Sequence, residues 1–119
     1  MKEIDALKCV LDFFRDCPTR YQVAYDAMKE EEKLESDLLH KIELDAGYEE
    51  RNRLATQLKQ CLKRRRENKD ILEELEPVLE FLEDRNNKKT VDKMVQLLGK
   101  MRKVEKYHKN RSYHPRIEG

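Results

Sequence analysis

The chain has 119 residues, of which 43% are charged and 38% hydrophobic, with three glycines, three prolines and no tryptophan, and its 26 basic and 25 acidic residues leave a net charge of +1. This length is typical of one domain, and the composition suits long amphipathic helices better than a β-sandwich or a barrel. No stretch approaches the about 20 apolar residues of a membrane span, and the first residues carry acids where a signal peptide has basic ones, so we expect a cytoplasmic protein without membrane contact.

The amino-terminal third is predicted to form two helices. Apolar residues at steps of three and four indicate an amphipathic helix over residues 3–15. Pro18 is expected to end this pattern and to begin a second helix over residues 18–46, because a proline in the first helical turn lacks only an N–H that would be unpaired anyway. Gly47 then allows the chain to reverse in a short loop.

Residues 48–84 carry the most regular pattern in the chain, which is typical of a coiled-coil seam. Leu54, Cys61, Asn68, Leu75 and Leu82 share one heptad position, and Leu58, Arg65, Leu72 and Leu79 share the other. Arg65 and Asn68 interrupt the seam at its centre. Polar seam residues can fix register, but the simpler interpretation is that both point outward. Pro77 lies off the seam, where we expect a kink.

The carboxyl-terminal part is predicted to contain a loop, a helix and a tail. Residues 84–89 form the loop, and Thr90 is the candidate N-cap of a helix over residues 90–108. Gly99 inside this helix should weaken it by about 1 kcal/mol relative to alanine. Residues 109–119 lack an apolar stripe and are expected to form a basic, aromatic tail.

The predicted fold class is therefore all-α, with a single helical domain over residues 1–108. We expect a long, coiled-coil-like antiparallel hairpin of residues 18–46 and 48–84, with the amino- and carboxyl-terminal helices packed on it. A homodimer is an alternative, because the seam could extend past what one chain covers.

The charges are sorted into blocks of opposite sign. Residues 1–58 sum to −5, residues 59–69 to +5, residues 70–84 to −7 and residues 85–116 to +9. If the chain reverses at Gly47, the basic run of residues 59–69 faces the acidic run of residues 25–35, which would fix the register of the hairpin. The acidic block cannot neutralise all of the carboxyl-terminal block.

Two basic sets are candidates for partner binding. The leading set lies in the carboxyl-terminal block, where cations alternate with aromatic rings that can stack on bases or anchor a protein interface. It comprises Lys100, Arg102, Lys103, Lys106, Tyr107, His108, Lys109, Arg111, Tyr113, His114 and Arg116. A tail folded back so that its tyrosines cover the seam is an alternative with equal support. The second set is a basic patch that a nucleic acid could bind, unless the acids of residues 26–35 pair with it: Lys59, Lys63, Arg64, Arg65, Arg66 and Lys69.

No motif in the chain indicates an enzyme, a cofactor or a metal. The sequence contains no glycine-rich phosphate loop, no HExxH and no G-x-S-x-G, and three cysteines without CxxC spacing are expected to be reduced thiols. We expect a non-enzymatic protein with no cofactor and no metal site.

Four segments follow one another within roughly residues 36–116, namely Leu39–Leu44, Lys63–Asp70, Leu75–Pro77 and the ending from Leu98 to Arg116. As an ordered set they resemble small, uncharacterised helical proteins that are encoded by phages and prophages of Gram-positive bacteria. The resemblance implies a phage setting in a bacterial host cell and transfers no functional residues. The expected function is protein binding that modulates, and as a host-defence inhibitor could block, a bacterial nucleic-acid machine. The alternative is a nucleic-acid-binding accessory of phage replication or recombination.

Overall fold

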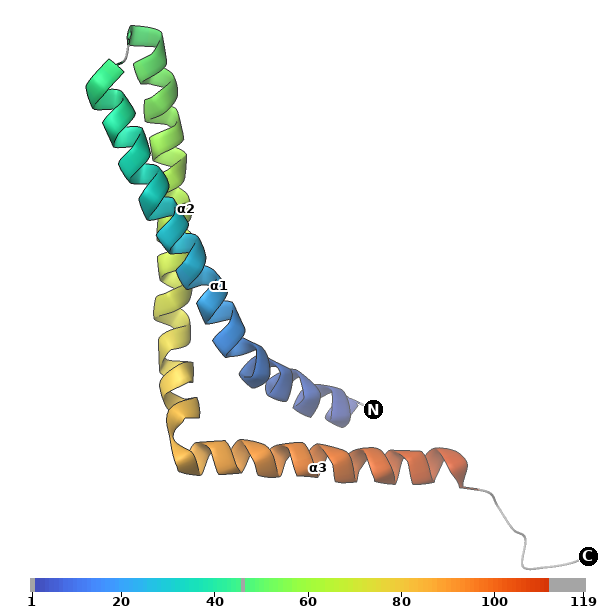
Figure 1. Cartoon of the computed structure of the whole chain (residues 1–119). Coiled ribbons are helices and arrows are strands. Elements are labelled where there is room, and N and C mark those ends of the chain that lie inside the picture. The colour runs from blue at the N-terminus through green and yellow to red at the C-terminus, as the bar shows by residue number, and fades with distance from the viewer. Residues whose placement is uncertain (1, 46, 112–119) are drawn as a thin grey trace, which may run out of the picture. The chain divides into compact units, whose positions relative to one another are not determined.

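The protein is described by a computed structural model, which covers residues 2–45 and 47–111. Over these ranges it forms three helices, α1 (Lys2–Asp45), α2 (Tyr48–Glu83) and α3 (Arg85–Asn110), and no strand (Figure 1). The prediction of an all-α fold is confirmed. The predicted tail falls mostly outside these ranges, because residues 112–119 are not described.

Contacts within the chain define two compact units. The hairpin unit comprises Asp16–Phe81, and the terminal unit comprises the residues up to Arg15 together with those from Leu82 onward. Helix α1 runs through both units without a break. The single domain expected over residues 1–108 stays a prediction, because units that share a helix can still fold as one.

The helix break expected at Pro18 is wrong. Helix α1 continues through Pro18 for 44 residues, although an interior proline removes one backbone hydrogen bond and crowds the preceding turn. Side chains on both sides of the proline are buried in packed faces, including Leu11, Cys17 and Ala24. Tertiary packing therefore outweighs the local preference of proline for a helix start.

The buried stripe of α1 changes phase close to Pro18. Buried or half-buried residues follow steps of three and four at Ile4, Leu7, Leu11 and Phe14, and again from Cys17 onward. From Phe14 to Cys17 there is a second successive step of three, which displaces the stripe around the helix. The segment before this point packs on α3 and the segment after it packs on α2.

The hairpin unit pairs α1 with α2 in an antiparallel arrangement (Figure 1). Leu38 of α1 packs with Leu54 of α2 in a core cluster that includes Cys61. Thirty residues before Cys61, the carbonyl of Glu31 accepts a hydrogen bond from its thiol at 3.1 Å. Lower positions in α1 thus meet higher positions in α2, as the predicted reversal at Gly47 requires.

The seam predicted in α2 is the packed face of the helix. Leu54, Cys61, Leu72 and Leu75 are buried, and the remaining seam residues, including Arg65 and Asn68, are half-buried. The expectation that Arg65 points outward is wrong, because its guanidinium lies against α1. Pro77 lies inside α2, which continues to Glu83.

The terminal unit has a thin core of its own. Ile4 and Leu11 from α1 pack with Leu98 from α3, and half-buried side chains surround them, namely Leu7, Val91, Met94 and Met101. The amino-terminal and carboxyl-terminal helical segments therefore contact each other. Their predicted packing on the hairpin stays a prediction.

Helix α3 begins five residues earlier than expected. Asp84 is its N-cap, and its carboxylate accepts hydrogen bonds from the backbone N–H groups of Asn86 at 2.8 Å and Asn87 at 3.3 Å. Thr90, the predicted cap, lies inside the helix, where its hydroxyl donates to the carbonyl of Asn86 at 3.0 Å. A carboxylate at the cap also interacts favourably with the helix dipole, so Asp84 takes the role.

Among the described residues, none of the helices combines the length and the apolar character that a membrane crossing requires.

Candidate functional site

The leading candidate set lies on an exposed, strongly basic helix. Residues 85–111 contain ten lysines and arginines and two acidic residues, for a net charge of +8. Leu98 is the one buried side chain of α3 in the described structure. The side chains of α3 that pack in the terminal unit lie on one face of the helix. Most of the helix surface therefore faces solvent.

The described candidates in the set are all exposed: Lys100, Arg102, Lys103, Lys106, Tyr107, His108, Lys109 and Arg111. The other three, Tyr113, His114 and Arg116, lie outside the described residues. Helix α3 extends to Asn110, so Lys109 belongs to the helix and not to the predicted tail.

Five side chains share the outer face of the last two turns. Lys103, Lys106, Tyr107, Asn110 and Arg111 follow the one-face spacing of a helix and line a shallow hollow. Asn110 was not among the sequence candidates. Its amide adds a neutral donor and acceptor, and the signal for it was the seven-residue spacing from Lys103.

The cations of the leading set have little internal compensation. Lys109 pairs with Glu105 at 3.4 Å, whereas Lys100, Lys103, Lys106 and Arg111 have no carboxylate within ion-pair distance in residues 2–45 and 47–111. The positive potential of the helix is thus available to an acidic partner.

The aromatic candidates form a small ring pair. Tyr107 is 65% exposed, and its ring centre lies 6.0 Å from that of His108 in a tilted arrangement. A tyrosine this exposed adds little to a core, so Tyr107 does not cover the seam; Tyr113, the other tyrosine of that alternative, lies outside the described residues.

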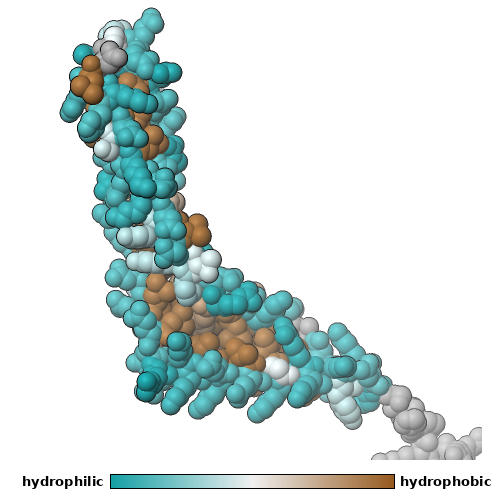
Figure 2. Space-filling model, in the orientation of Figure 1, coloured by the Kyte–Doolittle hydropathy of each residue, from teal (hydrophilic) through white to brown (hydrophobic). Residues whose placement is uncertain are grey.

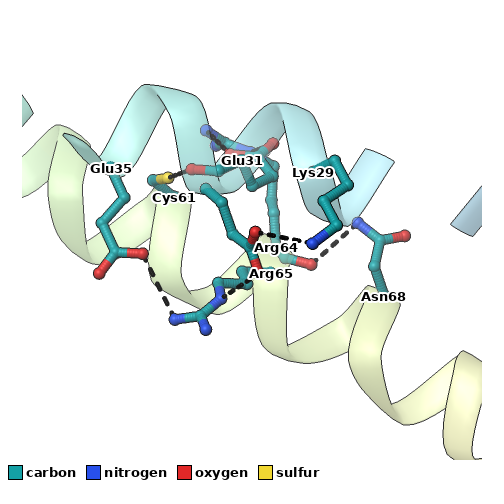
Figure 3. Close-up of polar contacts among 8 residues, drawn as sticks. Lys29, Glu31, Glu35, Cys61, Arg64, Arg65 and Asn68 are labelled. Atoms are coloured by element: carbon teal, nitrogen blue, oxygen red, sulfur yellow. Dashed lines mark hydrogen bonds and ion pairs between the residues drawn. The ribbon is translucent and has the colours of Figure 1, made fainter. Parts of the chain in front are cut away.

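The second basic set is partly used inside the hairpin unit (Figure 3). Arg64 binds Glu31 through two donors, at 2.7 and 3.2 Å. Arg65 donates to Glu35 at 3.3 Å and lies 3.8 Å from Glu32. These ion pairs confirm, for Arg64 and Arg65, the predicted pairing with the acidic run.

The other members of the second set, Lys59, Lys63, Arg66 and Lys69, are exposed. Arg66 and Lys69 border a small hollow with Leu62 and Arg65. Arg64 and Arg65 are already held by carboxylates, which leaves these four as a weaker basic patch.

The structure also shows which residues of α1 face the polar centre of the α2 seam. In α1 the packed positions run at steps of three and four through Met28, Glu31, Glu35 and Leu38. Glu31 and Glu35 therefore stand in the seam, where they contact Cys61 and Arg65 of α2. Two heptad series were the signals that could have identified them: Leu38, Glu31, Ala24 and Cys17 for Glu31, and Ile42, Glu35, Met28 and Tyr21 for Glu35.

These contacts shift two pKa values. The hydrogen bond from Arg64 holds the pKa of the Glu31 carboxyl below its ordinary value, against the opposing effect of burial. Burial, followed by the adjacent Glu31, raises the pKa of the Cys61 thiol to about 11. Cys61 is therefore a neutral thiol that donates a hydrogen bond, which is a structural role and not that of a nucleophile.

Within the described part of the chain, no three histidine, cysteine, aspartate or glutamate side chains converge as metal ligands would. Comparisons of the chain with protein-family models, with curated proteins and with solved structures found no significant match.

Proposed function

We propose that this chain is a non-enzymatic protein-interaction module that binds and modulates a bacterial nucleic-acid machine through the exposed face of α3. The observation that carries the proposal is the net charge of +8 on residues 85–111, most of it on exposed side chains beside the exposed ring of Tyr107. Tyrosine and arginine are enriched among the residues that dominate interface energetics.

The resemblance to phage-encoded proteins suggests where such a module acts. A small phage protein that binds a host nucleic-acid machine would be suited to inhibit a defence system, including a CRISPR effector.

Affinity purification from a lysate of Gram-positive bacteria tests the proposal. The full chain should retain a host protein in near-stoichiometric amount, and nuclease treatment should not release it. Loss of every retained protein after nuclease treatment would contradict the proposal, since the contact would then be bridged by nucleic acid.

Direct nucleic-acid binding is the second candidate function, as an accessory of phage replication or recombination. It is favoured by the +9 balance of residues 85–116. Neutralisation of phosphates releases counterions, so the affinity should fall steeply as salt rises. Absence of binding to labelled single-stranded and duplex DNA or RNA at low salt would remove this candidate.

A further inference from the structure

Helix α3 carries a second ordered stripe that its packing does not use. Residues Lys93, Leu97, Lys100, Val104, Tyr107 and Arg111 follow one another at steps of four, three, four, three and four. All six are exposed, with exposed fractions of 50% for Leu97 and 52% for Val104. Such spacing places them along one line of the helix surface, about 27 Å long at about 1.5 Å per residue.

The stripe is separate from the core of the terminal unit. The core face uses Val91, Met94, Leu98 and Met101, which also repeat at steps of three and four but with a different phase. Figure 2 shows apolar side chains gathered over the amino-terminal part of α1 and over α3. Val10 on α1 adds a further exposed apolar side chain to this unit, at 43% exposed.

We infer that this stripe binds an acidic amphipathic helix of a partner protein, an inference that rests on the proposed function and names its partner class. A helix with apolar residues at steps of three and four can lay them between Leu97 and Val104. Acidic residues that flank its apolar stripe would then face Lys93, Lys100 and Arg111. The partner helix adds a third helix to a unit whose two helices bury few side chains fully.

Charge decides between this occupant and a second copy of the chain. Each copy of residues 85–111 carries +8, so two copies that met on the stripe would bring like charges together, which is unfavourable, whereas an acidic helix brings opposite charges together. The apolar residues decide against a nucleic acid, because phosphates do not require Leu97 and Val104. Two aliphatic side chains also offer less apolar area than a helix that lies in a membrane surface.

A binding assay with a defined probe tests the inference. The probe is a synthetic helical peptide with leucines at steps of three and four and flanking glutamates, compared with a scrambled peptide of the same composition. The full chain should bind the ordered peptide at least about tenfold more tightly than the scrambled one, because only the ordered peptide presents its leucines on one face.

Matched variants locate the site. Val104→Ser should weaken peptide binding about tenfold, whereas Val95→Ser should leave it unchanged, although Val95 is equally exposed at 54% and lies on another side of α3. Lys100→Glu should weaken binding more than Lys88→Glu, which changes the net charge equally. Circular dichroism of each variant verifies that the helices are retained.

The outcomes separate the inference from the function on which it rests. Equal binding of ordered and scrambled peptides, or equal losses for Val104→Ser and Val95→Ser, would overturn the inference. So would tighter binding to anionic phosphatidylglycerol vesicles or to DNA than to the ordered peptide, or sedimentation that shows association through the stripe. If the lysate still yields a host protein after nuclease treatment in any of these cases, the proposed function stands and the partner is of another class.

Discussion

Individual side chains in the hairpin unit have roles that their chemistry and burial define. Cys17 and Cys61 are fully buried, whereas Cys9 is exposed. Burial raises the pKa of both buried thiols. Because the thiolate is the reactive form, the three cysteines should differ sharply in reactivity.

Thiol labelling checks this expectation. With a chromogenic disulfide reagent at pH 8, one thiol per folded chain should react quickly, and Cys9→Ser should abolish that phase. All three thiols should react once the chain is unfolded in guanidinium. Rapid reaction of two or more thiols in the folded chain would show that Cys17 or Cys61 is open to solvent.

The Glu31–Arg64 ion pair links the seam to pH. The pKa of Glu31 is lowered in the folded chain, so the pair contributes stability above the ordinary carboxyl pKa of about 4.3 and loses that contribution as the pH falls through the lowered value. Arg64→Gln should raise the pKa of Glu31. The variant should be less stable than the wild type at neutral pH, and this difference in the free energy of unfolding should disappear as the pH falls through the lowered pKa.

Titration of the Glu31 carboxyl by NMR, with urea unfolding at several pH values, measures both effects. Arg66→Gln is the control. Arg66 is an exposed neighbour, so this substitution removes the same charge but leaves the Glu31–Arg64 pair in place. An unchanged pKa of Glu31 in Arg64→Gln would mean that the hydrogen bond does not cause the shift.

At the scale of the elements, a proline inside a long helix is the feature that the sequence pattern misrepresents. Pro18 lies in the interior of α1, where proline is about 3 kcal/mol less favourable than alanine. Replacing proline by alanine also makes the unfolded chain more flexible, which lowers the free energy of unfolding by at most about 1 kcal/mol. Pro18→Ala should therefore raise the free energy of unfolding by roughly 2 kcal/mol.

Urea unfolding measures that change. If Pro18 stood in the first turn of a separate helix, the substitution would lower stability slightly or leave it unchanged, so the sign of the effect distinguishes the two structures. Pro77→Ala, inside α2, serves as a second interior position and should also be stabilising.

Gly99 in α3 offers an independent check on helix energetics. A Cβ placed on Gly99 would meet no atom within 4 Å, so alanine fits without strain. Gly99→Ala should stabilise the chain by about 1 kcal/mol, measured by the thermal or urea midpoint. A loss of stability would indicate that another chain or segment packs closely at this position.

At the scale of the whole molecule, the chain divides into two units that each have a small core. Leu98→Ala should destabilise the terminal unit, and Leu38→Ala should destabilise the hairpin unit, because each residue belongs to one core cluster. Truncation of a buried leucine costs about 2–5 kcal/mol, enough to open a thin core locally.

Hydrogen exchange with mass spectrometry resolves the two effects. Leu98→Ala should speed exchange mainly in residues 2–15 and 85–110, and Leu38→Ala mainly in residues 16–81. Equal acceleration along the entire chain in both variants would show that the two units open together as one cooperative domain.

The candidate site was predictable in part. The basic character of residues 85–116 follows from the charge blocks, whereas the exposure of Tyr107 comes from the structure, because the sequence equally allowed the ring to cover the seam. The ordered stripe through Leu97 and Val104 does not stand out in the sequence, because Val104 follows Met101 at a step of three and so continues the spacing of the packed face. Only the identity of the packed face, which contains Leu98, assigns them to the surface.

The sequence by itself determined the helical class, the reversal at Gly47, the seam of α2 and the pairing of Arg64 and Arg65 with acidic residues. These follow from periodicity and charge order, which act along the chain and across one hairpin. The tertiary structure decided that α1 continues through Pro18, that Arg65 lies in the seam and that the terminal segments pack on each other. Local preferences favour each alternative by a few kcal/mol at most, and packing between residues far apart in sequence outweighs them.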